Sequence, residues 1–99
     1  MNILKKSAYA GTLESSDTYI HVSPIEENKI KIILESSVEE IYGEAIEELV
    51  MHTITEMGVS NILVKVQDKG ALDFVIKARV QAAVLRACEL TEPEWEKLS

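Results

Sequence analysis

Cysteine is nearly absent from this chain of 99 residues, and proline, phenylalanine and tryptophan are also scarce. The single cysteine, Cys88, cannot close an internal disulfide and provides no paired ligands for a metal ion. A chain that does without disulfides is typical of a reducing compartment. We therefore expect a cytoplasmic protein with no metal site.

Long hydrophobic runs are also missing. No apolar run approaches the roughly 18–20 residues that a membrane-spanning helix needs. Lys5 and Lys6 are not followed by a long apolar stretch, so the start of the sequence does not predict a signal peptide. We expect no membrane partner.

Positive charge is in deficit, with 10 Lys and Arg against 17 Asp and Glu and a formal net charge of −7. The basic residues are scattered, whereas proteins that bind nucleic acid cluster them along the phosphate backbone. The balance argues against nucleic acid as a partner. An acidic surface instead suits docking onto basic surfaces of other proteins.

Length and composition predict one domain over residues 1–99, with terminal tails at 1–6 and 91–99. Apolar residues make up 46% and charged residues 27%, which is the usual mixture of a folded globular chain. A domain of this size holds one modest core. Since it has no room for a deep cleft between two lobes, an independent enzyme is not expected.

The order of the predicted elements is strand, strand, strand, helix, strand, helix. Alternating patterns over 18–22 and 29–34 predict two strands that form a hairpin, with Ile30, Ile32 and Leu34 on one face. A shorter extended segment covers about 8–13, where Gly11 marks a bulge or close approach, and the fourth strand covers 62–66. The fold class is therefore α+β: a four-stranded, mostly antiparallel sheet with two helices on one face.

Helical spacing begins at Val38 and ends at Gly58, and a second helix runs from about Leu72 to Leu90. Ser37 with Glu40, or Ser36 with Glu39, could form a capping box at the first helix. The apolar stripe expected for this helix is Val38, Ile41, Ala45, Leu49 and Met57, with Ile46, Val50 and Ile54 beside it. If the third and fourth strands pair in parallel, the crossover through this helix should be right-handed.

Motifs for catalysis are absent from the sequence. There is no glycine-rich phosphate loop, no paired metal-ligand spacing and no nucleophile elbow. His21 and His52 lack a serine and carboxylate set that would form a triad, and Cys88 is expected to pack in a helix. These residues are interpreted as ordinary structural positions.

Serine is the remaining candidate for special chemistry, as a passive hydroxyl that another enzyme modifies. The segment Leu-Glu-Ser-Ser occurs twice, ending in Ser15 and Ser16 and again in Ser36 and Ser37. The first pair lies in a predicted turn, and the second opens a helix, where the dipole favours an attached phosphate. From the residues alone, all four also fit ordinary caps and turns, and the choice between the sites stays open.

Residues 10–15, Ala-Gly-Thr-Leu-Glu-Ser, followed by Asp17, resemble the opening signature of the citrate lyase acyl carrier protein family, the gamma subunit of that complex. Residues 68–73, Asp-Lys-Gly-Ala-Leu-Asp, followed by Ala78 and Arg79, resemble its second signature. Segments 36–39, 42–43 and 93–96 fit the family as well, so the resemblance covers nearly the whole chain.

The resemblance implies a covalent prosthetic group, 2'-(5''-phosphoribosyl)-3'-dephospho-CoA, attached through Ser15. The sequence departs from the family at Ser16, where relatives can have glycine. The arm's thiol would hold acetyl or citryl while citrate is cleaved to acetate and oxaloacetate, and the chain itself would not catalyse a step. Its implied partners are the alpha and beta subunits, the enzyme that loads the arm and an acetate ligase that acts on the arm thiol.

Three alternatives remain beside this interpretation. The carrier subunit of malonate decarboxylase uses the same type of arm, a conventional phosphopantetheine carrier shares the size and charge, and an unmodified structural subunit needs no arm. The strand patterns disfavour the phosphopantetheine carrier, which is a helical bundle.

Four further residues are interpreted without a fixed role in the chemistry. Asp17 is expected to hold the turn, and Arg79, beside the apolar stripe, to have a fixed partner. Lys69 and Arg79 could instead meet phosphates of the arm. Trp95 packs on its own domain or anchors a partner subunit.

Overall fold

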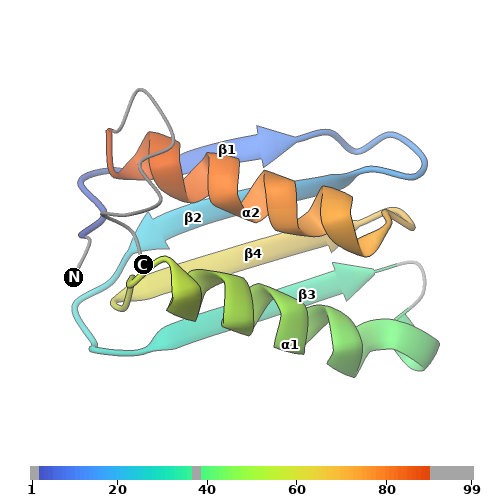
Figure 1. Cartoon of the computed structure of the whole chain (residues 1–99), viewed down its shortest axis with the longest axis horizontal. Helices are drawn as coiled ribbons and strands as arrows, with labels where there is room; N and C mark the ends of the chain where they lie inside the picture. The colour runs from blue at the N-terminus through green and yellow to red at the C-terminus, as the bar shows by residue number, and fades with distance from the viewer. Residues whose placement is uncertain (1–2, 37–38, 90–99) are drawn as a thin grey trace.

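The sheet contains four strands and is covered by two helices, both on the same face (Figure 1). The computed structural model describes residues 3–36 and 39–89. The elements in chain order are β1 (Ala8–Gly11), β2 (Thr18–Pro24), β3 (Ile30–Ser36), α1 (Glu39–Glu56), β4 (Ile62–Asp68) and α2 (Asp73–Ala87). The predicted α+β class and element order are confirmed. The expected cap Ser37, Trp95 and the tail at 91–99 lie outside the described residues.

The strands lie in the order β1-β2-β4-β3. β1 pairs with β2 and β2 with β4 in antiparallel fashion, whereas β3 pairs with β4 in parallel. Two of the three pairings are antiparallel, so the expected mixture is confirmed. The predicted hairpin between the second and third strands is wrong, because β4 lies between them.

The connection between β2 and β3 explains how β4 comes to lie between them. It crosses the beginning of β4 and is fixed there by Asn61, whose carbonyl accepts from the Ile25 N–H at 3.1 Å. The Asn61 side-chain amide donates to the Glu26 carbonyl at 3.2 Å, and the Ile62 N–H donates to the Lys29 carbonyl at 3.1 Å. These bonds keep β2 and β3 one strand apart, and β4 lies in the space between them.

The core lies between the sheet and the helices. β4 supplies its centre through Ile62, Val64 and Val66, which are buried, and β3 contributes the predicted face of Ile30, Ile32 and Leu34. α2 buries Ile76, Val80, Ala83, Val84 and Ala87. Fully burying one large aliphatic side chain is worth about 1.5–3 kcal/mol, so this layer dominates the stability.

α1 buries only part of the predicted apolar set. Ile46, Val50 and Ile54 are buried, as is Met57 just beyond the helix, while Ile41 and Ala45 are exposed. Figure 1 shows the reason: α1 begins beyond the end of β3, so its first turns have no sheet beneath them. The apolar residues of these turns remain at the surface.

The segment before β1 is attached to the core. Leu4, within the expected tail at 1–6, is buried, and the Lys5 and Lys6 N–H groups both donate to the Ala87 carbonyl, at 2.9 and 3.3 Å. The start of the described chain is therefore tied to the end of α2.

Candidate functional site

Ser15 lies at the tip of a tight turn between β1 and β2. The Asp17 N–H donates to the Glu14 carbonyl at 3.1 Å, which makes Ser15 and Ser16 the two central residues of the turn. Ser16 has a φ of 65°, a left-handed conformation that glycine adopts most easily. Both serine side chains are exposed, and among the described residues the Ser15 hydroxyl has no hydrogen-bond partner.

The turn is held against the loop that follows β4. The Ser16 N–H donates to the Lys69 carbonyl at 2.8 Å, and the Lys69 N–H donates to the Asp17 carbonyl at 2.9 Å. These two bonds extend the antiparallel pairing of β2 with β4 beyond the pair Thr18 and Asp68. The hydroxyl of Ser15 is thus presented from a backbone of fixed geometry.

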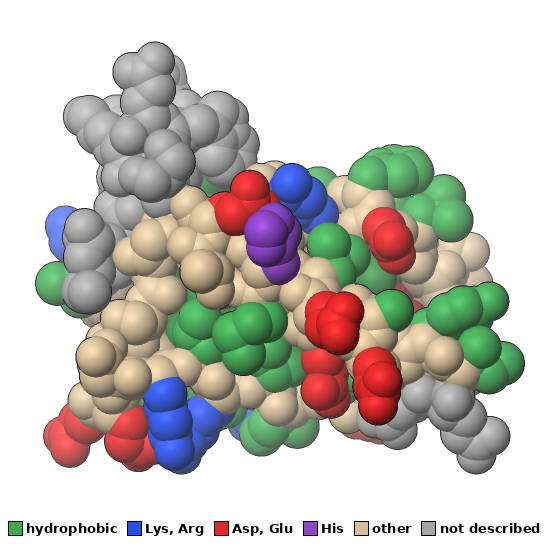
Figure 2. All heavy atoms as spheres, turned by 60° about the horizontal axis from the view of Figure 1, so that its bottom comes forward, with side chains coloured by type: hydrophobic (Ala, Val, Ile, Leu, Met, Phe, Trp, Pro, Cys, Tyr) green, Lys and Arg blue, Asp and Glu red, His purple; other side chains and the backbone are tan. Residues whose placement is uncertain are grey.

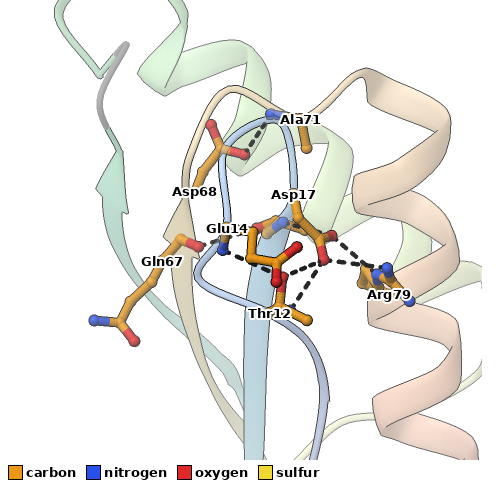
Figure 3. A network of polar contacts seen from close by, with 8 residues as sticks. Thr12, Glu14, Asp17, Gln67, Asp68, Ala71 and Arg79 are labelled. Carbon is orange, nitrogen blue, oxygen red and sulfur yellow. Dashed lines mark hydrogen bonds and ion pairs between the residues drawn. The ribbon is translucent and has the colours of Figure 1, made fainter.

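Asp17 is the centre of a polar network beneath the turn (Figure 3). Its Oδ2 accepts from the Thr12 N–H at 3.1 Å and from Thr12 Oγ1 at 2.7 Å, and its Oδ1 accepts from the Thr18 N–H at 2.8 Å. Arg79 donates to both oxygens, through Nε at 3.1 Å and Nη2 at 3.2 Å. The expected turn role of Asp17 and the fixed partner of Arg79 are confirmed.

This network changes the acidity of Asp17. The hydrogen bond from Thr12, followed by that from Arg79, lowers the pKa of Asp17 to about 2. The carboxylate is therefore ionised at neutral pH, and the guanidinium compensates its charge. Of the two acids that flank the serines, only Glu14 presents a charge without a cation bound to it among the described residues.

Gly11 allows the two strands to meet at the base of the turn. Its φ is 91°, and a Cβ atom at this position would lie 1.8 Å from the Thr18 carbonyl oxygen. No side chain fits at that distance, so the close approach predicted from the sequence is confirmed. The close contact with the Thr18 carbonyl explains why the first signature has glycine at position 11.

Asp68 shapes the second signature in a similar way. This buried carboxylate accepts from the Gly70 N–H and the Ala71 N–H, both at 3.1 Å, and from Ser36 Oγ at 3.0 Å. It folds the loop that supports the Ser15 turn and fixes Ser36 at the end of β3. Sequence reasoning missed this role, although an Asp placed two residues before a glycine is a common turn signal.

The remaining candidates do not join this site. His52 faces Glu56 on α1 at 3.3 Å, and Cys88 is buried, where desolvation raises the pKa of its thiol. Over residues 3–36 and 39–89, no group of three His, Cys, Asp or Glu side chains could hold a metal ion. Nor is any helix there long and apolar enough to cross a membrane. The Ser15 turn can offer a hydroxyl for modification, and no described residue accepts a hydrogen bond from it.

Several known proteins are similar to this chain over nearly its whole length. The citrate lyase acyl carrier protein of Vibrio cholerae is 51% identical over 92 residues, covering 93% of this chain and 94% of that protein. The citrate lyase acyl carrier protein 2 of Salmonella typhimurium is 52% identical over 93 residues, covering 94% and 96%. The chain belongs to the family of citrate lyase acyl carrier proteins. As a member, it is an acyl carrier subunit rather than a catalytic one.

Two broader comparisons support the fold of this carrier. Residues 5–87 match the family model described as ACP, malonate decarboxylase delta subunit. A chain in the crystal structure of a Pseudomonas malonate decarboxylase hetero-tetramer in complex with malonate superposes with a TM-score of 0.74 at 18% identity, covering 88% of this chain and 92% of that one. At that identity the likeness extends to the fold alone.

Proposed function

We propose that the protein is the acyl carrier of a cytoplasmic citrate lyase and carries 2'-(5''-phosphoribosyl)-3'-dephospho-CoA on Ser15. The observation that carries the proposal is the exposed Ser15 hydroxyl, which has no hydrogen-bond partner among the described residues and closes the first family signature at the tip of a braced turn. When attached, the arm supplies a terminal thiol that holds the acetyl or citryl group.

The residues around Ser15 fit a phosphodiester of this kind. The Ser15 side chain is exposed, so the attachment point is open to a bulky arm. Arg79 compensates the charge of Asp17, which reduces the repulsion between the turn and a phosphate. The braced backbone keeps the attachment point in place while the arm moves, so the loaded thiol stays at a high effective concentration near bound partners.

The choice of Ser15 over Ser16 has two supports. Ser15 is the residue that matches the closing serine of the family signature. Ser16 occupies the left-handed position of the turn, a conformation that glycine adopts most easily, which gives the residue a conformational role. Ser36 donates to the Asp68 carboxylate, which makes it a structural residue.

The proposed partners are the alpha and beta subunits of citrate lyase, the enzyme that loads the arm and an acetate ligase acting on its thiol. Malonate decarboxylase is the second candidate complex, because the family model and the structural neighbour carry that name. The relatives at about half identity are named for citrate lyase, which favours citrate as the substrate.

The test is substrate turnover by the complex assembled with the loading enzyme and activated with acetate. We expect the wild-type carrier and Ser16→Ala to support cleavage of citrate and no decarboxylation of malonate. Ser15→Ala should fold normally, because an exposed turn hydroxyl contributes little to stability, and should abolish turnover.

Either of two results would contradict the proposal. One is full citrate cleavage with Ser15→Ala, which would show that the arm is not attached to Ser15. The other is turnover of malonate in place of citrate, which would move the carrier to the second complex.

A further inference from the structure

The sheet face that the helices leave uncovered carries two tyrosines in contact with each other. Both helices pack on the other face (Figure 1), so alternate residues of the strands point to this open face. Tyr9 on β1 is 58% exposed and Tyr19 on β2 is half-buried, and their rings stack with centroids 5.6 Å apart. Such a pair offers a flat aromatic surface on which another planar ring can stack.

A hollow of about 330 Å³ opens beside Tyr19 on the open face. Its lining includes Tyr19, His21, Ile33, Glu35, Lys65 and Gln67. Since β1 lies on one side of β2 and β4 on the other, Tyr9 and the hollow lie on opposite sides of Tyr19. The ring of Tyr19 is therefore supported on one side and borders the hollow on the other. The volume is at the lower end of the range for small-molecule sites.

Two polar side chains of the hollow are free to bind a ligand. Over residues 3–36 and 39–89, the Gln67 side-chain amide and the Lys65 ammonium have no hydrogen-bond or ion-pair partner. Figure 3 shows the Gln67 side chain directed away from the network around Asp17. An amide donates and accepts at once, which matches the edge of an adenine base. The hollow thus combines a stacking surface with a group that can pair with the base.

The open face is less acidic than the rest of the molecule. The charged residues of the described strands on this face are Lys31, Lys65 and Glu35, whereas the chain as a whole has 17 Asp and Glu against 10 Lys and Arg. Lys31 is paired with Glu27 at 2.7 Å, so Lys65 is the cation that remains for a ligand. Figure 2 shows carboxylates over α1, in the other layer. Phosphates are therefore repelled less at the open face than over the helices.

The hollow lies within reach of Ser15. Tyr19 pairs with Gln67 in the first row of open-face residues after the turn. It follows Ser15 by four residues, which cover at most about 14 Å of extended chain. In the proposed group, one phosphate and two pentose rings separate the serine from the adenine, and together they span about the same length. The pantetheine and its thiol extend from the other end of the adenosine.

We propose that Tyr19, supported by Tyr9, stacks on the adenine of the arm attached to Ser15, with Gln67 at the edge of the base and Lys65 near the diphosphate. This inference rests on the proposed function and adds a second, non-covalent holding point for the arm. Aromatic side chains hold bases in many proteins in this way. Docking of the adenine confines the movement of the arm to its pantetheine segment, which raises the effective concentration of the thiol near bound partners.

NMR spectra of loaded carrier, with its arm located on Ser15 by mass spectrometry, test this inference. Stacking should move the adenine H2 and H8 signals upfield of their positions in free 3'-dephospho-CoA, with NOEs to the Tyr19 ring. Tyr19→Leu keeps a large apolar side chain but removes the ring, and Tyr19→Phe restores the ring. Tyr42→Leu is the matched control, because Tyr42 is 55% exposed and lies on α1 in the helix layer.

We expect Tyr19→Leu to lower the ratio of docked to undocked adenine about tenfold, so that most of the upfield shift is lost. Tyr19→Phe and Tyr42→Leu should keep the wild-type shift. Amide spectra recorded before loading show whether each variant is folded. In the Ser15→Ala carrier, which has no arm, AMP should shift the signals of Tyr19 and Gln67 only at about millimolar concentration, because the tether is missing.

Adenine signals at their free positions in the loaded wild type would overturn the inference. So would a wild-type upfield shift that persists in folded Tyr19→Leu. Binding of AMP at micromolar concentration would assign the face to a free nucleotide, and a dimer of unloaded carrier that Tyr19→Leu dissociates would assign it to a second copy; either result would overturn the inference. A wild-type carrier that accepts no arm would instead refute the proposed function.

Discussion

Asp17 and Arg79 define the site at the scale of single residues. They are 62 positions apart in the chain, yet their contact fixes the turn that presents Ser15. A carboxylate that accepts two bonds from a guanidinium and three from Thr12 and Thr18 holds its geometry better than a solvated acid does. The turn is therefore held by charge-assisted bonds rather than by apolar packing.

The pKa of Asp17 predicts a pH dependence of stability. Its folded pKa of about 2 is below the ordinary value of 3.8, so the folded state favours the ionised form. Its contribution is fully present above about pH 4, falls as the pH drops from about 4 towards 2, and is lost below the folded pKa. Urea unfolding of the wild type and Asp17→Asn should differ by about 1–2 kcal/mol at pH 6 and progressively less towards pH 2. A difference that stays constant over this range would show that the carboxylate is not stabilised by its partners.

Gly11 gives a second prediction at this scale. Gly11→Ala should destabilise the fold by more than about 3 kcal/mol, because the new methyl would collide with the Thr18 carbonyl. Gly70→Ala is the control: its φ is 87°, but nothing lies within 4 Å of the added atom. It should cost only about 1–2 kcal/mol from backbone strain. Equal losses in thermal or urea unfolding would argue against the close approach at Gly11.

At the scale of elements, the two faces of α1 can be tested directly. Ile54→Ala should lower the free energy of unfolding by about 2–5 kcal/mol, because Ile54 is fully buried. Ile41→Ala should change it by no more than about 0.5 kcal/mol, because the side chain is exposed. Urea titration of both variants measures this contrast. A large loss of unfolding free energy from Ile41→Ala would show that Ile41 is buried, as the sequence pattern predicts.

The elements also show what sequence patterns can and cannot supply. The alternation at Ile30, Ile32 and Leu34 identifies both the strand and its buried face, since period and burial are local properties. The neighbour of that strand is not local: β4 follows 18 residues of helix and still inserts beside β3. The first turns of α1 extend beyond the end of the sheet, and the sequence pattern does not show where the sheet ends. The pattern therefore could not tell that Ile46 and Val50 would be buried and Ile41 exposed.

At the scale of the whole molecule, the fold has a structural part and a presenting end. The core lies between the sheet and the helices, while Ile41, Leu72 and Phe74, at the end where both helices begin, remain exposed. The two signatures, separated by more than 50 positions in the sequence, meet at this end through the bonds of Lys69 with Ser16 and Asp17. The resemblance could predict an attachment serine, but only the three-dimensional arrangement shows how Arg79 and Lys69 hold its turn in place.

The most direct test of the account is the position of the covalent arm in protein purified with an active complex. Tandem mass spectrometry of a proteolytic peptide spanning residues 10–17 would locate the added mass on one side chain. We predict the full mass of the phosphoribosyl dephospho-CoA group on Ser15, with Ser16 unmodified. An unmodified peptide, or an arm on Ser16 or elsewhere in the chain, would contradict the account.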